Sequence, residues 1–333
     1  MRILITTGLS EGDTGGPSQY GPRLRDEFQA LGHKVKVVSY GFVEKALPVG
    51  LRHIYFFLKI IPAVFWADKV MALDTFSVGV PSLFAARLFG RKIIVRIGGD
   101  FLWESYVERT GEKITLRQFN SAILRLNIKE KLILYFTKIL LKSADKLSFN
   151  TEWQKNIWHK QYNISYVKSC VVRNYIPPKS LGPVDIRDKK FLWAGRKIKL
   201  KNLNLLQEVG NEVQREVADF KLEIVSGISH LKLQDIIRNC YAVVLPSFSE
   251  VCPNFILETV SHGKPFIMTE ETGLKEVYNK GGIFIDPFDK KALKEAILSM
   301  SDTGKYKQYQ KELTFFEPRP WRTVAREFLS ICQ

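Results

Sequence analysis

The sequence has few cysteines, no long apolar run and no excess of acidic residues. Its four cysteines among 333 residues are scattered without a Cys-x-x-Cys pair, which argues against a disulfide scaffold or a zinc ribbon and favours a reducing cytoplasm. The most apolar stretch, Leu51 to Ala67, is interrupted by Arg, His, Lys and Pro, whereas a membrane-spanning helix needs about 20 mostly apolar residues. No signal peptide follows Met1. These absences predict a cytoplasmic protein that is soluble or lies on a membrane surface.

Metal-binding patterns are also missing. His33, His53, His159 and His230 are isolated and show no metal-ligand spacing, and His262 lies in a helical pattern where we interpret it as a packing residue. No Asp-x-Asp element follows a strand, so a metal-bound diphosphate is not indicated. We expect neither a metal site nor a cofactor.

Positive charge is abundant. The chain has 50 Lys and Arg against 34 Asp and Glu, a net charge of 50 − 34 = +16. Such an excess favours polyanionic partners: nucleotides, nucleic acid or an anionic membrane.

The order of apolar runs predicts an α/β protein. A strand at Ile3–Thr7 leads into a glycine-rich loop, a helical pattern that Gly32 ends, and a second strand from Val35, which is how a doubly wound domain begins. Strand and helix patterns then alternate, with a basic helix expected over 121–143 and a final amphipathic helix over 321–331. Further strand-like runs lie at 69–73, 92–97, 146–150, 169–172, 190–194, 221–225, 242–246, 265–268 and 282–285.

A proline pair after Asn174 is the candidate hinge between two domains. The fold class is therefore α/β, with two doubly wound Rossmann-like domains facing each other across a cleft. We expect an N-terminal domain over 1–174, a C-terminal domain over 175–317, and a C-terminal segment, 318–333, whose helix packs back on the first domain. In such a fold, strand ends and helix N-termini bind anionic ligands.

The most specific segment runs from Pro246 through Glu250 and Glu258 to Pro265. Glu250 lies in the turn after a strand, and Glu258 lies eight residues later within a helix. The loop between them, which includes Asn254 and Phe255, offers backbone N–H groups to a phosphate or a sugar hydroxyl. A carboxylate one or two turns into the helix can accept hydrogen bonds from both hydroxyls of a ribose.

Two other loops point to phosphate chemistry. Arg196 and Lys201 follow the first strand of the second domain, where cations can neutralise a diphosphate. Gly15 and Gly16 in the first loop of the chain allow a close backbone approach to a ligand. This loop is not the Gly-x-Gly-x-x-Gly fingerprint, which argues against an NAD enzyme.

Together these motifs resemble retaining glycosyltransferases of family 4, the group 1 transferases with the GT-B fold. The resemblance implies that Glu258 holds the ribose of a nucleotide-sugar and that Glu250 faces the transferred sugar. It also implies that Arg196 and Lys201 clamp the donor diphosphate, and that the pair Gly15–Gly16 approaches the donor.

The sequence departs from that family in two places. Asp100 stands where many relatives carry a histidine near the sugar, so Asp100 is the catalytic candidate there, with a helix N-cap as the equally good alternative. The section between Val225 and Tyr241 is short, so no residue is assigned to the nucleobase.

The implied activity is metal-independent transfer of a hexose-type sugar from a nucleotide-diphosphate sugar to an acceptor hydroxyl, with retained configuration. The implied acceptor is a glycan or a lipid-linked saccharide in cell-surface polysaccharide or glycolipid synthesis. The basic helix over 121–143 predicts peripheral binding to the cytoplasmic face of a membrane. The alternatives are a sugar-nucleotide epimerase of the same architecture and a basic nucleic-acid-binding protein, although no nucleic-acid recognition module is evident.

Overall fold

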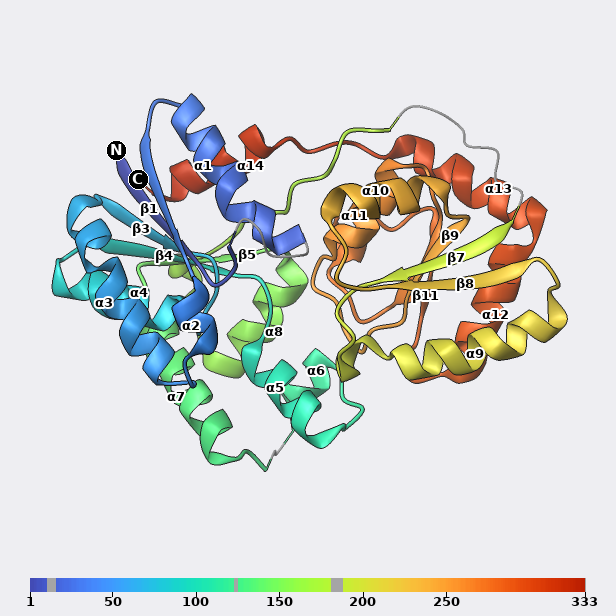
Figure 1. The fold of residues 1–333 in the computed structure, drawn as a ribbon, viewed down its shortest axis with the longest axis horizontal. Helices are drawn as coiled ribbons and strands as arrows, with labels where there is room; N and C mark the ends of the chain where they lie inside the picture. Colours follow the sequence, from blue (N-terminus) through green and yellow to red (C-terminus); the bar gives the residue numbers. More distant parts are fainter. Residues whose placement is uncertain (11–15, 123–124, 181–187, 333) are drawn as a thin grey trace. The chain divides into compact units, whose positions relative to one another are not determined.

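Two parallel β-sheets covered by helices organise the chain, as the sequence pattern predicts (Figure 1). The computed structural model describes residues 1–10, 16–122, 125–180 and 188–332. In that part of the chain, each sheet belongs to its own compact unit.

Backbone contacts define the two units. Unit 1 comprises Met1–Tyr106, Ile123–Arg173 and Trp321–Gln333, and unit 2 comprises Val107–Ala122 and Asn174–Pro320. The break after residue 173 lies one residue from the boundary expected after 174, and the chain re-enters unit 1 at 321 instead of 318. Residues 107–122, expected in the N-terminal domain, instead lie in unit 2. The reason is local bonding, because the Leu116 amide donates to Ser249 Oγ at 2.9 Å and Arg117 pairs with Glu271 at 3.5 Å.

The sheet of unit 1 has the strand order β2-β1-β3-β4-β5-β6, and all its strands are parallel. Helix α1 packs beside β1 and β2, whereas α4 packs against β3 and β4, so strands alternate with covering helices. The α-helices and strands in chain order are β1 (Arg2–Thr7), α1 (Tyr20–Ala30), β2 (Lys34–Ser39), α2 (Phe42–Ala46), α3 (Leu51–Trp66), β3 (Lys69–Ala72), α4 (Gly79–Leu88), β4 (Lys92–Ile97), α5 (Phe101–Thr110), α6 (Leu116–Phe119), α7 (Ile128–Ser143), β5 (Lys146–Phe149), α8 (Glu152–Tyr162) and β6 (Ser169–Val171), of which α6 and the end of α5 belong to unit 2.

Local sequence sets the ends of these helices. Gly32 has a φ of +84°, a left-handed conformation that suits glycine and ends α1 as expected. Helix α7 begins later than the predicted 121, because Asn127 caps it: its side chain accepts from the Glu130 amide at 2.8 Å, and Glu130 accepts from the Asn127 amide at 2.9 Å. The predicted basic helix is therefore limited to 128–143.

The sheet of unit 2 has the order β11-β10-β9-β7-β8, again with parallel strands. Helix α9 packs on β8 and on α12, and α10 packs on α11. The elements that remain, in chain order, are β7 (Lys189–Ala194), the 3-10 helix η3 (Lys199–Lys201), α9 (Leu203–Glu216), β8 (Phe220–Val225), α10 (His230–Asn239), β9 (Ala242–Leu245), α11 (Asn254–Ser261), β10 (Phe266–Thr269), β11 (Gly282–Ile285), α12 (Lys290–Ser301), α13 (Thr303–Glu312) and α14 (Trp321–Ile331).

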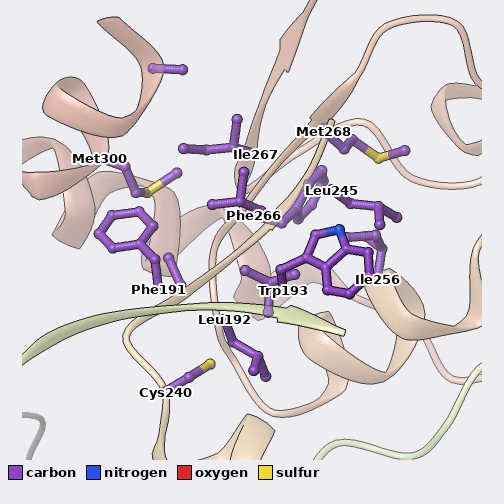
Figure 2. Close-up of a cluster of buried hydrophobic side chains, with 14 of the residues drawn as sticks. Phe191, Leu192, Trp193, Cys240, Leu245, Ile256, Phe266, Ile267, Met268 and Met300 are labelled. Atoms are coloured by element: carbon purple, nitrogen blue, oxygen red, sulfur yellow. The ribbon is translucent and has the colours of Figure 1, made fainter. Parts of the chain in front are cut away.

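The core of unit 2 surrounds its central strands. Phe191, Leu192 and Trp193 of β7 are fully buried, and Figure 2 shows them among side chains from β9, β10 and α11. A strand buried on both faces reads as a continuous apolar run, which is why the sequence identifies these strands. The polar residues that follow such strands are thereby collected at the edge of the sheet.

The C-terminal helix α14 belongs to unit 1, where it packs against α1. Val324, Ala325 and Phe328 are buried on one side of α14. The Trp321 ring meets the Tyr20 ring edge-on, with 4.9 Å between ring centroids. The apolar face of the amphipathic helix α14 thus packs on α1 of unit 1.

Replacing Phe328 by alanine should destabilise unit 1. Phe328 is fully buried, and losing a buried phenylalanine ring costs about 3–5 kcal/mol of unfolding free energy. Urea unfolding followed by circular dichroism measures the change. Phe42→Ala is the control, because Phe42 is largely exposed and its loss should change stability by no more than about 0.5 kcal/mol. Equal stabilities of the two variants would contradict the packing of α14 on unit 1.

Candidate functional site

The candidate site of unit 2 lies where its strand order reverses. The chain passes from β7 to β8 on one side and then returns to β9 on the other side of β7. In open parallel sheets, ligands bind outside the carboxyl ends of the strands at such a reversal. Arg196 and Lys201 follow β7, and Glu250 follows β9.

Two contacts join these loops. The Phe248 amide donates to the Leu200 carbonyl at 2.8 Å, and the Lys201 ammonium forms a short ion pair with Glu250 Oε1. The side chains of Lys201 and Glu250 are 18% and 11% exposed, so the pair is largely withdrawn from water. The structure therefore brings together two of the sequence-predicted residues.

Glu250 is fixed by its backbone as well as by Lys201. Its amide donates to the Glu271 carbonyl at 3.0 Å, its carbonyl accepts from Gly273 at 3.3 Å, and Ser247 Oγ donates to Glu250 Oε1 at 2.7 Å. One carboxylate oxygen thus receives both a cation and a hydroxyl, and such charge-assisted bonds are stronger than neutral ones. Glu250 is a constrained residue of the site instead of a solvated loop acid.

The loop after Glu250 leads into the N-terminus of α11. Pro253 precedes the helix and makes no side-chain cap. The Asn174 amide group donates to the Cys252 carbonyl at 3.2 Å and to Asn254 Oδ1 at 3.1 Å, so it holds the loop from the hinge segment. Asn254 and Phe255 occupy the first turn of α11, where backbone N–H groups and the helix dipole favour an anion.

Glu258 lies in the second turn of α11 and is 9% exposed, so it is not a surface residue. Its two carboxylate oxygens have different partners on α10. Glu258 Oε1 lies 3.1 Å from His230 Nε2, and Glu258 Oε2 accepts from Gln234 Nε2 at 2.7 Å. A carboxylate has about four lone-pair sites, so each oxygen can still accept another hydrogen bond.

His262, one turn after Glu258, extends this network. Its Nε2 lies 2.8 Å from Gln234 Oε1, and because that oxygen only accepts, His262 Nε2 carries the proton. Burial foremost, with Arg238 and Lys264 nearby, lowers the pKa of His262, so the ring is neutral at pH 7. The Gln234 amide is thereby oriented with its nitrogen toward Glu258.

The sequence pattern does not reveal this network. In the sequence His230 looks isolated, His262 looks like a packing residue, and Gln234 belongs to no motif. Both helices carry an i,i+4 polar pair, His230 with Gln234 and Glu258 with His262, which places each pair on one helix face. That spacing was the available signal, although only the tertiary structure shows that the two faces meet.

Arg196 is exposed in the loop after β7. The segment that follows it is anchored at two points. The Lys199 ammonium donates to the Glu108 carbonyl at 2.8 Å, and Asn202, in a left-handed conformation with φ +54°, donates from Nδ2 to the Pro287 carbonyl at 2.7 Å. These anchors fix η3 and therefore the position from which Lys201 reaches Glu250.

In unit 1, Asp100 caps helix α5. Asp100 Oδ1 accepts from the Leu102 amide at 2.9 Å and from the Trp103 amide at 3.0 Å. Burial raises the pKa of Asp100 to about 6, although the two amide bonds oppose that shift. The N-cap alternative is therefore realised in the structure. Gly15 lies outside the described residues, and Gly16 begins a short 3-10 helix.

In the part of the chain that the structure describes, no group of three or more His, Cys, Asp or Glu side chains could hold a metal ion.

Replacing Asp100 by asparagine should stabilise the protein in a pH-dependent manner. Asparagine keeps the capping oxygen but carries no charge. Since the folded state raises the pKa of Asp100 from 3.8 to about 6, the wild-type protein loses stability as the pH rises through that range. At pH 4 the unfolding free energies of D100N and wild type should be nearly equal. At pH 7 that of D100N should be higher by up to about 3 kcal/mol.

Chemical denaturation at several pH values measures this difference. Asp100→Ala is the control, because it removes the charge and also the cap, which costs about 1 kcal/mol relative to D100N at every pH. A difference between D100N and wild type that does not change with pH would contradict the buried carboxylate.

Comparison with known proteins agrees with this architecture. The family model described as glycosyl transferases group 1 matches residues 186–303, which include the loops after β7 and β9 and the helix α11. A search of curated proteins found no match.

Solved structures match over the whole chain. Sucrose-phosphate synthase from Thermosynechococcus elongatus has a TM-score of 0.77 at 13% identity, and the match covers 100% of this chain and 98% of that chain. HepE from Anabaena, solved in complex with UDP-glucose, has a TM-score of 0.70 at 13% identity with 99% of both chains covered. WaaG, a glycosyltransferase involved in lipopolysaccharide biosynthesis, has a TM-score of 0.68 at 13% identity with 99% of both chains covered.

At these identities the structures establish the fold, and the family match covers the segment that carries the candidate residues from Arg196 to Glu258. Residues 186–303 thus match the group 1 glycosyl transferase model, and the chain as a whole has the two-domain α/β fold, called GT-B, of these solved structures.

Proposed function

We propose that this protein transfers a hexose-type sugar from a nucleotide-diphosphate sugar to an acceptor hydroxyl, with the anomeric configuration retained. The observation that carries the proposal is the meeting of Lys201 and Glu250 at the strand reversal of unit 2. A cation and a carboxylate side by side supply the two charges that the reaction needs: one for the leaving diphosphate and one for the sugar.

The leaving group is a diphosphate, which gains negative charge as the bond to the sugar breaks. Arg196 and Lys201 follow β7, and both can stabilise that charge without a metal ion. The N–H groups at the start of α11, at Asn254 and Phe255, add positive potential from a third element. We therefore assign diphosphate binding to these four residues and propose that no cofactor takes part.

Glu250 fits a supporting role better than a nucleophilic one. Its Oε1 is already engaged by Lys201 and Ser247, and a carboxylate oxygen so engaged is a weaker nucleophile. We propose a front-face substitution in which the departing diphosphate accepts the proton of the incoming hydroxyl. Glu250 then stabilises the positive charge that develops on the sugar.

Glu258 suits the ribose of the donor. Its carboxylate is buried and held in one plane by His230 and Gln234, which leaves lone pairs for two adjacent hydroxyls. A preoriented acceptor loses less conformational entropy when the ligand binds. Gln234 and His230 act as positioning residues, because they act on the ribose through Glu258.

The acceptor is proposed to be a glycan or a lipid-linked saccharide of a cell-surface polysaccharide or glycolipid. WaaG, which shares the fold, is involved in lipopolysaccharide biosynthesis, and HepE has been solved with UDP-glucose. We propose that unit 1 recognises this acceptor, that Asp100 is the candidate catalytic residue of unit 1, and that Gly15 and Gly16 are candidate donor-binding residues. We propose a cytoplasmic location with peripheral attachment to the membrane.

Removing the diphosphate and ribose contacts should abolish most donor turnover. Arg196→Ala and Glu258→Ala should each lower kcat/KM by about 100- to 1,000-fold, the effect of losing one transition-state contact of about 2.7–4 kcal/mol. Lys197→Ala is the matched control, because Lys197 is an exposed cation in the same loop and should keep turnover within about threefold.

Turnover is followed as release of nucleoside diphosphate, with and without saccharide acceptors. Near-wild-type rates in both R196A and E258A would overturn the assignment. An isomerised donor released without any acceptor would identify an epimerase instead.

Removing Gln234 should weaken donor binding more than it slows the bound complex. A panel of UDP-, GDP-, ADP- and dTDP-sugars first identifies the donor by thermal stabilisation, since a ligand at 100 times its Kd adds about 2.7 kcal/mol. With that donor, Gln234→Leu should raise KM about tenfold and leave kcat within about threefold, because Glu258 loses its orientation but keeps its charge.

Lys232→Leu is the matched control on the exposed side of the same helix, and its KM should equal that of wild type. Gln234→Asn tests rescue, because a shorter amide restores part of the network. A KM of Q234L equal to that of K232L would show that Glu258 needs no positioning by α10.

A further inference from the structure

Helix α3 of unit 1 is apolar on both of its sides. Its inner side, with Phe56, Ile60 and Val64, is fully buried against the sheet and α4. Its outer side is an apolar stripe at helical spacing that remains exposed: Leu51, Ile54, Tyr55, Leu58 and Phe65. A helix that is apolar all round is normally buried, so an exposed outer stripe indicates a surface that another apolar phase covers.

The neighbouring helices extend this stripe. Helix α4 packs on α3 and exposes Phe84 and Leu88, and α2 packs on α3 and exposes Phe42 and Val43. We call the stripe and these four side chains the α3 surface. Monomeric proteins rarely expose so many large apolar side chains on adjoining helices without a partner.

Acidic side chains are kept off the α3 surface. Neither α3 nor α4 contains an aspartate or a glutamate. In α2, Glu44 is buried and pairs with Lys59 at 2.6 Å, and in α7, Glu130 is fully buried as part of a helix cap. The charges presented to solvent on these helices are therefore basic.

Helix α7 supplies cations beside the α3 surface. It packs on α4, and it exposes Lys129, Lys131, Lys138 and Lys142. Exposed Ile128, Leu132 and Tyr135 lie among these lysines. Basic and apolar side chains mixed in this way favour an interface that is both anionic and apolar.

We propose that the α3 surface docks on an anionic lipid bilayer, with the outer stripe of α3 in the headgroup region and the lysines of α7 on acidic headgroups. A helix with an apolar face and basic neighbours lies in the plane of the membrane interface. No helix in the described ranges is long and apolar enough to cross a bilayer. The proposal moves the main membrane contact from the predicted 121–143 helix to α3.

A second copy of the chain fits this surface less well than a bilayer. A self-complementary interface would bring the basic edges of α7 and α3 of two copies together in a protein with a net charge of +16. Like charges at an interface oppose association, whereas acidic lipids neutralise them. The oligomeric state is therefore an informative outcome of the test.

The test is co-sedimentation of the full chain with two kinds of vesicle: phosphatidylcholine alone, and phosphatidylcholine with about one third phosphatidylglycerol. Wild type should bind the anionic vesicles and bind the neutral vesicles weakly. The double variant Leu58→Ser/Phe65→Ser should bind the anionic vesicles roughly tenfold less tightly, because two large apolar side chains no longer enter the lipid.

The double variant Leu231→Ser/Phe315→Ser is the matched control. Leu231 and Phe315 lie in unit 2 and are 83% and 68% exposed, compared with 57% and 65% for Leu58 and Phe65. The control should bind anionic vesicles like wild type. Lys129→Gln/Lys131→Gln should weaken binding at low salt and leave it unchanged at high salt, where headgroup attraction is screened.

Equal vesicle binding by L58S/F65S and wild type would overturn the proposal. So would a wild-type dimer that L58S/F65S converts to a monomer without changing vesicle binding, because the surface would then be an interface between copies. Thermal stabilisation by nucleotide-sugars, measured without vesicles, reports on donor binding and does not involve the α3 surface. Loss of vesicle binding can therefore be told apart from failure of the proposed transfer activity.

Discussion

Backbone pairing between β7 and β9 is the interaction on which the candidate site depends. The ladder joins Phe191 with Ala242 and Leu192 with Val243 although about 50 residues of chain separate the two strands. It sets the two following loops side by side at the carboxyl edge of the sheet, where Lys201 reaches Glu250. The buried aromatic and aliphatic side chains of β7 hold the two strands in register. The packing of the apolar core therefore sets the positions of Lys201 and Glu250.

A second constraint is the cost of burying charge. Lys201 and Glu250 compensate each other, and Glu258 is compensated by donors on a neighbouring helix. Such arrangements contribute little net stability, because desolvation offsets much of the attraction. Their use is to hold charged groups in fixed positions, which suits a reaction whose barrier is lowered by preorganised charges.

Unit 1 departs from the usual distribution of apolar side chains at one helix, α3. The strands and α1 follow the usual pattern of apolar interior and polar exterior, but α3 keeps large apolar side chains on its outer side. The absence of acidic residues from α3 and α4 makes that side suitable for an anionic apolar phase.

The strands, the final helix and the fold class could be predicted from the sequence, because buried parallel strands and amphipathic helices leave recognisable patterns of apolar residues. Arg196, Lys201 and Glu250 stand out as candidates in the sequence because they follow strands, and Glu258 because it lies in the helix after Glu250. Which side chains meet was decided by the tertiary structure. His230 and Gln234 lie more than 20 residues before Glu258 and have no motif of their own. The structure shows that Asp100 caps α5, a point that the sequence leaves open. The exposed side of α3 likewise looks like core in the sequence, because apolar composition does not tell which of two helix faces the protein itself covers.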